Sequence, residues 1–164
     1  MIDRLIVECM KTASVDMVLS LPCNMLSGVM QEIGRQSLTH ISVCREEEAV
    51  GIAAGAALAG RRPLLLMQNS GLGNCINALA SLTCLYRLPL FLLMSNRGGA
   101  GEQITAQVPM GQAAPRLLDV LGIDYIHVQT PSDIDRLGSF MHRTYSESVP
   151  GAALVSRELW HAEI

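Results

Sequence analysis

Three consecutive glutamates, Glu46 to Glu48, lead directly into the segment AVGIAAGAALAG, in which every residue is small or apolar. Successive residues of a helix are about 100° apart around its axis, so three adjacent carboxylates cannot share one face. At least one of them is therefore expected to point toward the packed side. A carboxyl group that loses water there has a raised pKa and can exchange a proton near neutral pH. We predict a proton-handling carboxylate in this triplet, and periodicity alone does not choose among the three.

The same glutamates have a purely structural interpretation, because negative charge at the start of a helix is stabilised by the helix dipole. That interpretation accounts for the acids but not for the residues that follow them. The positions at helical spacing after Glu46 are Ala49, Val50, Ala53 and Ala57, all of which are small. Because backbone can approach such a stripe closely, we expect a second chain to lie against it and to cover the carboxylate.

The stretch QNSGLGN, residues 68–74, follows a continuous apolar run and contains more polar groups than a turn requires. A dinucleotide-binding fingerprint needs a third glycine where this chain has Ile76, so the nucleotide signal is weak. One interpretation is a tight strand-to-helix turn, in which Asn69 or Ser70 caps the helix and the glycines supply positive φ. The other interpretation is a polar binding site. The sequence leaves both open.

The connection NRGGAGEQ, residues 96–103, is rich in glycine and contains one cation, Arg97. A guanidinium fork suits planar or tetrahedral oxyanions, so this segment is either a substrate-binding lid or a flexible connector with a surface arginine. Other chemistries have less support. The four histidines are scattered and no cysteine lies near them at ligand spacing, so we predict no metal site in this chain. No serine has the GxSxG context of a hydrolase nucleophile.

The elements that must position these groups alternate between strand and helix along the chain. This pattern predicts an α/β fold of one domain over residues 1–164, a three-layer sandwich around a mostly parallel sheet of about six strands. Ligands of such sheets bind outside the carboxyl ends of the strands, where we expect LPCN, CREEE, MQNSGLGN and MSNRGGAGE. We predict strands over 15–21, 40–44, 63–67, 88–94, 125–129 and 150–156. We predict helices over 2–13, 25–35, 46–60, 75–86, 112–121 and 131–148.

Composition narrows the classes of partner. Charged residues make up 16% of the chain, below the roughly 25% usual for a soluble domain, which predicts an apolar interface with another subunit. A net charge of −3 gives no basic surface for nucleic acid. The charged start, and an apolar run no longer than 88–94, predict neither a secretory signal nor a membrane span. Five cysteines without a CxxC pair are typical of reduced thiols in a cytoplasmic protein.

The string EEEAVGIAAGAALAG resembles a helix of the pyrimidine-binding domain in thiamine-diphosphate-dependent decarboxylases, which opens with a glutamate and continues E-x-x-A-x-x-x-A-x-G. Setting Gly55 on the glycine of that pattern places Ala53 and Ala49 on its alanines and Glu46 on its glutamate. MQNSGLGN, the strand that begins LPL, GEQITAQVPMGQA and LLDVLGIDY are similar to the branch that decarboxylates 3-substituted pyruvates, namely the sulfopyruvate and phosphonopyruvate decarboxylases. The similarity runs from residue 21 to residue 155.

The resemblance implies an activity and a set of site residues. It implies a carboxy-lyase that converts 3-sulfopyruvate to sulfoacetaldehyde and CO₂ in coenzyme M biosynthesis, and a separate chain of this length is similar to the alpha subunit of such an enzyme. It implies that Glu46 is catalytic and hydrogen-bonds N1′ of the cofactor's aminopyrimidine ring. The cofactor-binding residues that it implies are Pro22, Asn24, Glu46, Asn69, Ser70 and Gly71. The substrate-binding candidates are Arg97, Gln103, Gln107 and Gln112.

The resemblance also implies a partner subunit. Members of the family hold the diphosphate and Mg²⁺ with a GDG motif followed roughly 25 to 30 residues later by Asn-Asn, and this sequence has neither motif. A beta subunit is therefore expected to bind the phosphates and the metal, so that thiamine diphosphate is shared across a hetero-oligomer. Two alternatives remain. One is a phosphonopyruvate decarboxylase subunit, and the other is a non-catalytic, flavodoxin-like binding or regulatory module in which the glutamates only cap a helix.

Overall fold

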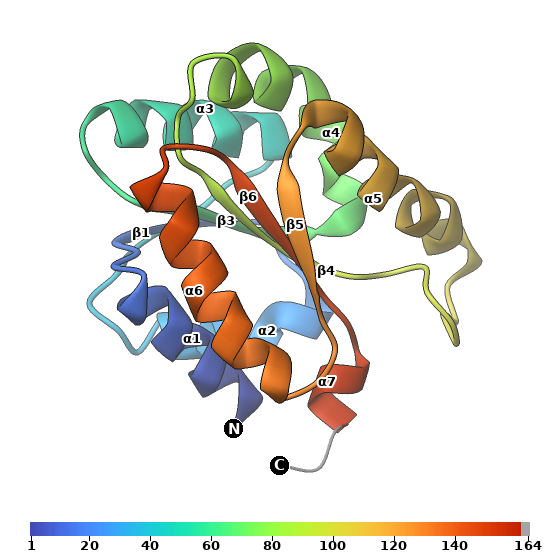
Figure 1. Ribbon diagram of the computed structural model, residues 1–164. Helices are drawn as coiled ribbons and strands as arrows, with labels where there is room; N and C mark the ends of the chain where they lie inside the picture. The colour runs from blue at the N-terminus through green and yellow to red at the C-terminus, as the bar shows by residue number, and fades with distance from the viewer. Residues whose placement is uncertain (162–164) are drawn as a thin grey trace.

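Alternating strands and helices build one six-stranded sheet in which every neighbouring pair of strands is parallel. The computed structural model describes residues 1–161 (Figure 1). The strand order is β2-β1-β3-β4-β6-β5, so β3 and β4 lie in the middle of the sheet and β2 and β5 form its edges. The strands are β1 (Met17–Ser20), β2 (Thr39–Ser42), β3 (Pro63–Gln68), β4 (Phe91–Ser95), β5 (Asp124–Val128) and β6 (Gly151–Val155).

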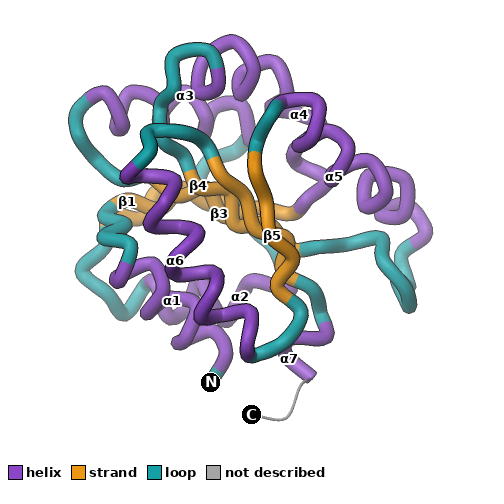
Figure 2. Tube along the Cα trace, in the orientation of Figure 1, coloured by secondary structure: helices purple, strands orange, loops and turns teal. Residues whose placement is uncertain are grey.

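Helices cover both faces of this sheet (Figures 1 and 2). One layer holds α1 (Ile2–Thr12), α2 (Ser27–Ile33) and α6 (Ser132–Ser146). The opposite layer holds α3 (Glu46–Leu58), α4 (Leu72–Ala78) and α5 (Val108–Leu121). The three-layer α/β fold predicted from the sequence is therefore confirmed. The shorter elements are the 3₁₀ turns η1 (Asn24–Leu26), η2 (Asn69–Gly71) and η4 (Thr105–Gln107), the π-helical segment η3 (Leu79–Cys84), and α7 (Glu158–His161).

The central strands are buried because each face of the sheet carries a helical layer. Side chains alternate between the two faces along a strand. Leu64 and Leu66 of β3 therefore pack in the core beneath α1 and α6, whereas Leu65 and Met67 pack in the core beneath α3 and α4. Both sets are fully buried. A strand covered on both faces needs apolar residues at every position, which explains why PLLLM shows no alternation.

The main differences from the predicted boundaries lie around two loops. The sequence predicts a helix from residue 112, but η4 precedes it and α5 already begins at Val108. Pro109 is tolerated there because the first N–H groups of a helix have no intrahelical partner. The helix predicted over 75–86 begins earlier, at Leu72, and its second half is the π-helical segment η3. Both shifts lengthen the helical layer that carries the site described below.

Among residues 1–161, no helix is long and apolar enough to cross a bilayer. The assignment of all 164 residues to a single domain stays a prediction, and residues 162–164 lie outside the described part of the chain.

Candidate functional site

The carboxyl ends of four adjacent strands meet at one edge of the sheet. β2, β1, β3 and β4 end at Ser42, Ser20, Gln68 and Ser95; Ser42 pairs with Ser20 and Gln68 pairs with Ser95, while β3 extends two residues beyond the partner of Ser20, which is Leu66. The segments that follow these ends contain most of the residues predicted to bind a ligand. They are LPCN after β1, CREEE after β2, NSGLGN after β3 and NRGGAGE after β4. The fold thus gathers segments that are far apart in the sequence at the edge where such sheets bind ligands.

Glu46 is the first residue of α3, and its half-buried side chain lies against the turn after β3. Asn74 Nδ2 donates a hydrogen bond to Glu46 Oε2 at 2.9 Å. Gly71 packs directly on the same carboxylate, because a Cβ atom at Gly71 would lie 2.7 Å from Glu46 Cγ. Glu46 Oε1 accepts no hydrogen bond from the described residues. One carboxylate oxygen is therefore held by the protein while the other is left for a donor from outside the chain.

The other two glutamates of the triplet are engaged differently. Glu47 Oε1 accepts a hydrogen bond from Arg45 Nε at 2.5 Å, and this bond lowers the pKa of Glu47. Glu48 is exposed, and its Oε2 accepts the backbone N–H of Cys44 at 3.1 Å. Of the three, only Glu46 accepts a hydrogen bond from a residue after β3, and Oε2 of Glu47 is buried without a hydrogen-bond partner among residues 1–161. Glu46 is therefore the glutamate of the triplet that a hydrogen bond joins to the segment after β3, and its catalytic role stays a prediction.

The small-residue stripe that follows Glu46 packs inside the chain. Ala49, Val50 and Ala53 are fully buried in the core that α3 forms with β3 and α4. The prediction that a second chain lies against these three residues is therefore wrong. The reason is that α3 lies flat on the sheet, so the face below Glu46 is the sheet-facing one. The outer face of α3 instead presents Gly51 and Gly55, each exposed and with open space where a Cβ would stand.

Asn69 is fully buried at the end of β3 and connects two of the gathered segments. Its Nδ2 donates to the backbone oxygen of Arg97 at 2.9 Å. Its Oδ1 is buried and has no hydrogen-bond partner among residues 1–161. Leaving such an acceptor unsatisfied costs about 1–3 kcal/mol, so this oxygen requires a donor from a ligand or a water molecule.

The side chains of Asn69 and Ser70 do not cap a helix, so the proposed capping role of these residues is wrong. Neither η2 nor α4 begins with a side-chain cap. The Ser70 hydroxyl accepts a hydrogen bond from Gln68 Nε2 at 2.5 Å, and the same nitrogen donates to Gln107 Oε1 at 2.7 Å. The first of these bonds stays within the turn after β3, whereas the second joins that turn to η4. Gln107 is thus the predicted substrate-binding glutamine that the fold brings to the turn after β3.

Arg97 forms a bidentate ion pair with Glu102, a residue that the sequence did not single out. Arg97 Nε and Nη2 donate to the two carboxylate oxygens at 2.8 and 2.7 Å, and the side chains are only 11% and 5% exposed. Glu102 also accepts the backbone N–H groups of Gly98 and Ile104. The pKa of Glu102 lies well below its ordinary value, mainly because of the hydrogen bonds from Arg97. The Arg97 guanidinium was predicted to bind a substrate oxyanion. Two of its N–H groups are instead bound by Glu102 of the same loop.

The remaining predicted residues lie on the surface of the same edge. Pro22 and Asn24 are exposed at the end of β1, immediately before and within η1. Gln103 and Gln112 are exposed on the loop after β4 and on α5. These four side chains can contact only a ligand or a chain that approaches from outside.

The ion pair of Glu102 leads to a prediction about acid stability. A carboxylate whose pKa is lower in the folded than in the unfolded state stabilises the fold at any pH above its unfolded-state pKa. This stabilisation is lost as the pH falls from the unfolded-state pKa toward the folded-state pKa. Glu102→Gln should therefore lower Tm by a few degrees at neutral pH, and the difference from wild type should shrink as the pH falls below the ordinary glutamate value of 4.5. Differential scanning calorimetry across this range measures both. A Tm difference that is the same at every pH would contradict the assigned role of the charge.

The cysteines give a second prediction. Cys44 is exposed, whereas Cys75 is buried beneath Glu46. Burial, with a further contribution from the charges of Glu46 and Glu47, raises the pKa of Cys75 to about 12. Because the thiolate is the reactive form, an aromatic disulfide reagent near pH 8 should modify roughly one thiol per native chain in its fast phase. Cys44→Ser should remove that phase. A fast phase that survives in Cys44→Ser and is lost in Cys75→Ser would show that the core around Glu46 opens.

Comparison with known proteins identifies the chain's relatives. The family model described as thiamine pyrophosphate enzyme, N-terminal TPP binding domain, matches residues 2–122. The chain belongs to the thiamine pyrophosphate enzyme family. Within this family, the chain is 40% identical over 164 residues to sulfopyruvate decarboxylase subunit alpha of Methanocaldococcus jannaschii, with 97% of this chain and 95% of the relative covered.

Two further relatives show how this thiamine pyrophosphate family member is related to longer chains. Sulfopyruvate decarboxylase of Methanosarcina acetivorans is 37% identical over 160 residues, which is 98% of this chain but only 41% of that protein. Phosphonopyruvate decarboxylase of Streptomyces viridochromogenes is 33% identical over 121 residues, 73% of this chain and 30% of that protein. Identity and coverage therefore favour the sulfopyruvate branch over the phosphonopyruvate branch.

A solved structure supports the fold of this thiamine pyrophosphate family member. "Split gene transketolase, inactive beta4 tetramer" aligns with a TM-score of 0.64 at 13% identity, over 96% of this chain and 50% of that one. At this level of identity the match concerns the fold alone.

The residues at the edge of the sheet fit the aminopyrimidine half of thiamine diphosphate. Such a ring offers a basic ring nitrogen and an exocyclic amino group. Glu46 Oε1, which lacks a partner among residues 1–161, can bind a ring nitrogen through a shared proton. The buried Asn69 Oδ1 requires an N–H or O–H donor. Gly71 leaves room for the carboxylate that any larger residue would displace. The polar groups at this edge of the sheet are therefore of the kind that could bind the cofactor named in the family description.

Proposed function

We propose that this chain is the pyrimidine-binding subunit of a decarboxylase that converts 3-sulfopyruvate to sulfoacetaldehyde and CO₂. The observation that carries the proposal is the position of Glu46, which Asn74 holds over Gly71 with one carboxylate oxygen left open. The choice of substrate follows the name of the Methanocaldococcus jannaschii relative, which this chain matches along almost its whole length.

The proposed role of Glu46 is to hold and move a proton at Oε1, the oxygen that would hydrogen-bond the ring nitrogen N1′ of the cofactor's pyrimidine. Asn74 keeps the other oxygen occupied, so the carboxylate retains one orientation. Pro22, Asn24 and residues 69–71 would hold the ring beside Glu46. Thiamine diphosphate, when bound, supplies the nucleophile and the electron sink for the loss of CO₂. The protein's part is to orient the ring and to control one proton, which general acid–base catalysis requires of a positioned carboxyl group.

We propose that the second half of the site comes from a separate subunit. The chain matches 41% of the single-chain Methanosarcina acetivorans enzyme, so the rest of that protein has no counterpart in these 164 residues. The proposed partner corresponds to that remainder and holds the diphosphate and Mg²⁺. The end of α3 opposite to Glu46 and the residues just after η3 fit a contact with another chain, because Leu58, Leu85 and Tyr86 are 74%, 66% and 66% exposed there. Large apolar groups exposed in this number favour burial against another chain.

The test is to purify the chain with and without its co-expressed partner and to assay CO₂ release from 3-sulfopyruvate and 3-phosphonopyruvate. We expect the assembled enzyme to prefer 3-sulfopyruvate and the isolated chain to be inactive with both. Calorimetric titration with thiamine diphosphate and Mg²⁺ should show tight binding only to the assembled enzyme. Absence of cofactor binding in both preparations would instead favour a non-catalytic module.

A further inference from the structure

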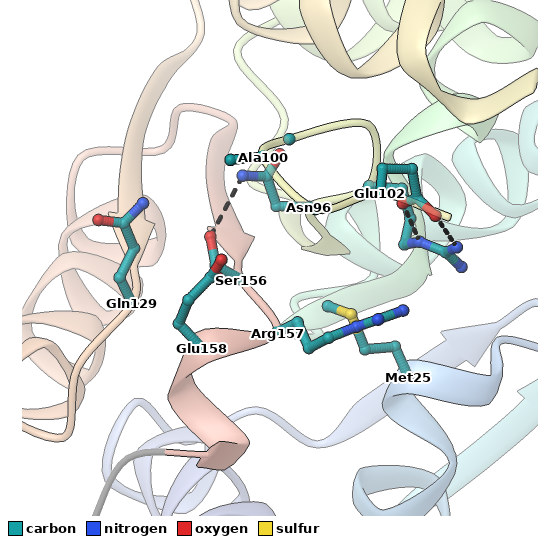
Figure 3. Close-up of a pocket in the computed structure, with 11 residues that line it drawn as sticks. Met25, Asn96, Ala100, Glu102, Gln129, Ser156, Arg157 and Glu158 are labelled. Atoms are coloured by element: carbon teal, nitrogen blue, oxygen red, sulfur yellow. Dashed lines mark hydrogen bonds and ion pairs between the residues drawn. The ribbon is translucent and has the colours of Figure 1, made fainter. Parts of the chain in front are cut away.

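A cavity of about 180 Å³ lies at the carboxyl ends of β4, β5 and β6 (Figure 3). It is beside the loop after β4 and beside η1, since Arg97 and Met25 line it. Ser156 and Arg157, which directly follow β6, form another part of its wall. The sequence prediction assigns no site residue after β6, so this part of the wall is new.

Hydrogen bonds connect this cavity to the site that contains Glu46. Asn69, two residues before Gly71, donates to the backbone oxygen of Arg97 at 2.9 Å. Asn96 Nδ2 in turn donates to Ser156 Oγ at 3.2 Å, as the dashed line in Figure 3 shows. The cavity is therefore linked, through buried or half-buried polar groups, to the turn after β3 against which Glu46 packs.

The two arginines of the cavity differ in their pairing. The guanidinium of Arg97 is bound to both oxygens of Glu102. Arg157 is exposed and makes no ion pair and no side-chain hydrogen bond with residues 1–161. Figure 3 shows Arg157 extended toward Met25, whereas the carboxylate of Glu158 is directed toward Ser156. Arg157 is thus the cation of this cavity whose charge no carboxylate of the described chain compensates.

We propose that Arg157 binds the anionic substituent on C3 of the substrate, the sulfonate of 3-sulfopyruvate. The inference rests on the proposed function, from which the substrate class comes. A guanidinium presents several N–H donors in a planar fork, which suits the tetrahedral oxygens of a sulfonate. Arg97, which was predicted for this role, has used its Nε–H and one Nη2–H on Glu102 and serves to hold the loop. The cavity is large enough for a sulfonate group and the carbon that bears it.

The test uses the enzyme assembled from this chain and its partner subunit. Arg157→Gln should raise the KM for 3-sulfopyruvate by about 10- to 100-fold, the effect expected for loss of a charge-assisted hydrogen bond, and should change kcat much less. Arg157→Lys, which keeps the charge without the fork, should give an intermediate KM. The unreactive analogue 3-sulfopropionate should show the same weakening as a competitive inhibitor and in direct calorimetric binding.

A matched control is Arg116→Gln, which removes the same charge from an exposed position on α5 that does not line the cavity. Its KM should stay within about threefold of wild type. If the KM of Arg157→Gln and its affinity for 3-sulfopropionate also stay within about threefold while wild type decarboxylates 3-sulfopyruvate, the inference is wrong and the proposed function stands. If the wild-type assembly does not decarboxylate 3-sulfopyruvate, the proposed function fails. Equal 3-sulfopropionate binding by wild type and Arg157→Gln would then overturn the assignment of Arg157 as well.

Discussion

Glu46→Gln, assembled with the partner subunit, is expected to lose at least about 100-fold in kcat for 3-sulfopyruvate, the range over which a positioned general acid or base contributes. Glutamine keeps the size of the side chain and can still accept the hydrogen bond from Asn74, but it cannot carry the proton. The loss should therefore occur without a change in fold. Circular dichroism and Tm check the fold, and calorimetry should show weaker binding of thiamine diphosphate.

Glu48→Gln is the matched control for this prediction. Glu48 lies on the same first turn of α3, but it is exposed and its carboxylate bonds only the backbone N–H of Cys44. Its kcat should stay within about threefold of wild type, since surface changes of this kind have small effects. If Glu46→Gln retained most of the wild-type kcat, Glu46 would have no part in proton handling, and the proposed function would lose the observation that carries it.

Gly71→Ala should cause a loss of activity of similar size through a steric effect. The added Cβ would lie 2.7 Å from Glu46 Cγ, closer than unbonded carbon atoms approach one another. Gly71 itself has an ordinary helical conformation, with φ of −65°, so alanine is not disfavoured by the backbone. The expected result is a displaced Glu46 carboxylate, with kcat reduced by roughly 100-fold. The measurement is kcat and KM of the assembled enzyme, together with a crystal structure of the variant.

Gly73→Ala is the control for the steric argument. A Cβ atom at Gly73 would meet only the terminal carbon of Met110, at 3.2 Å, and that flexible side chain can move. Activity should be nearly unchanged. A double-mutant cycle adds a second check: in a Glu46→Ala background, Gly71→Ala should destabilise the chain no further, because the atoms that clash are gone. Equal destabilisation in both backgrounds would place the cause of the effect elsewhere.

The fold could be predicted in large part from the sequence, because it rests on local patterns. Apolar runs such as residues 63–67 predict strands that are covered on both faces, and helical spacing predicts the segments between them. These patterns place the strand ends, and therefore the edge of the sheet at which ligands bind. The match of residues 46–60 to a family pattern also predicts which glutamate is catalytic. Where the prediction of boundaries is inaccurate, as at residues 105–110, the helix begins in a segment without apolar periodicity.

Four features of the site were decided only by the tertiary structure. Glu46 is held by Asn74 and Gly71, residues of another loop, and the alanines below it face the chain's own sheet rather than a partner. Arg97 is occupied by Glu102, and Arg157 lies beside the same cavity although it follows the last strand. Local periodicity describes each segment separately. Which side chains meet depends on the crossing of segments that are distant in sequence, and close packing of the two helical layers on the sheet determines that crossing.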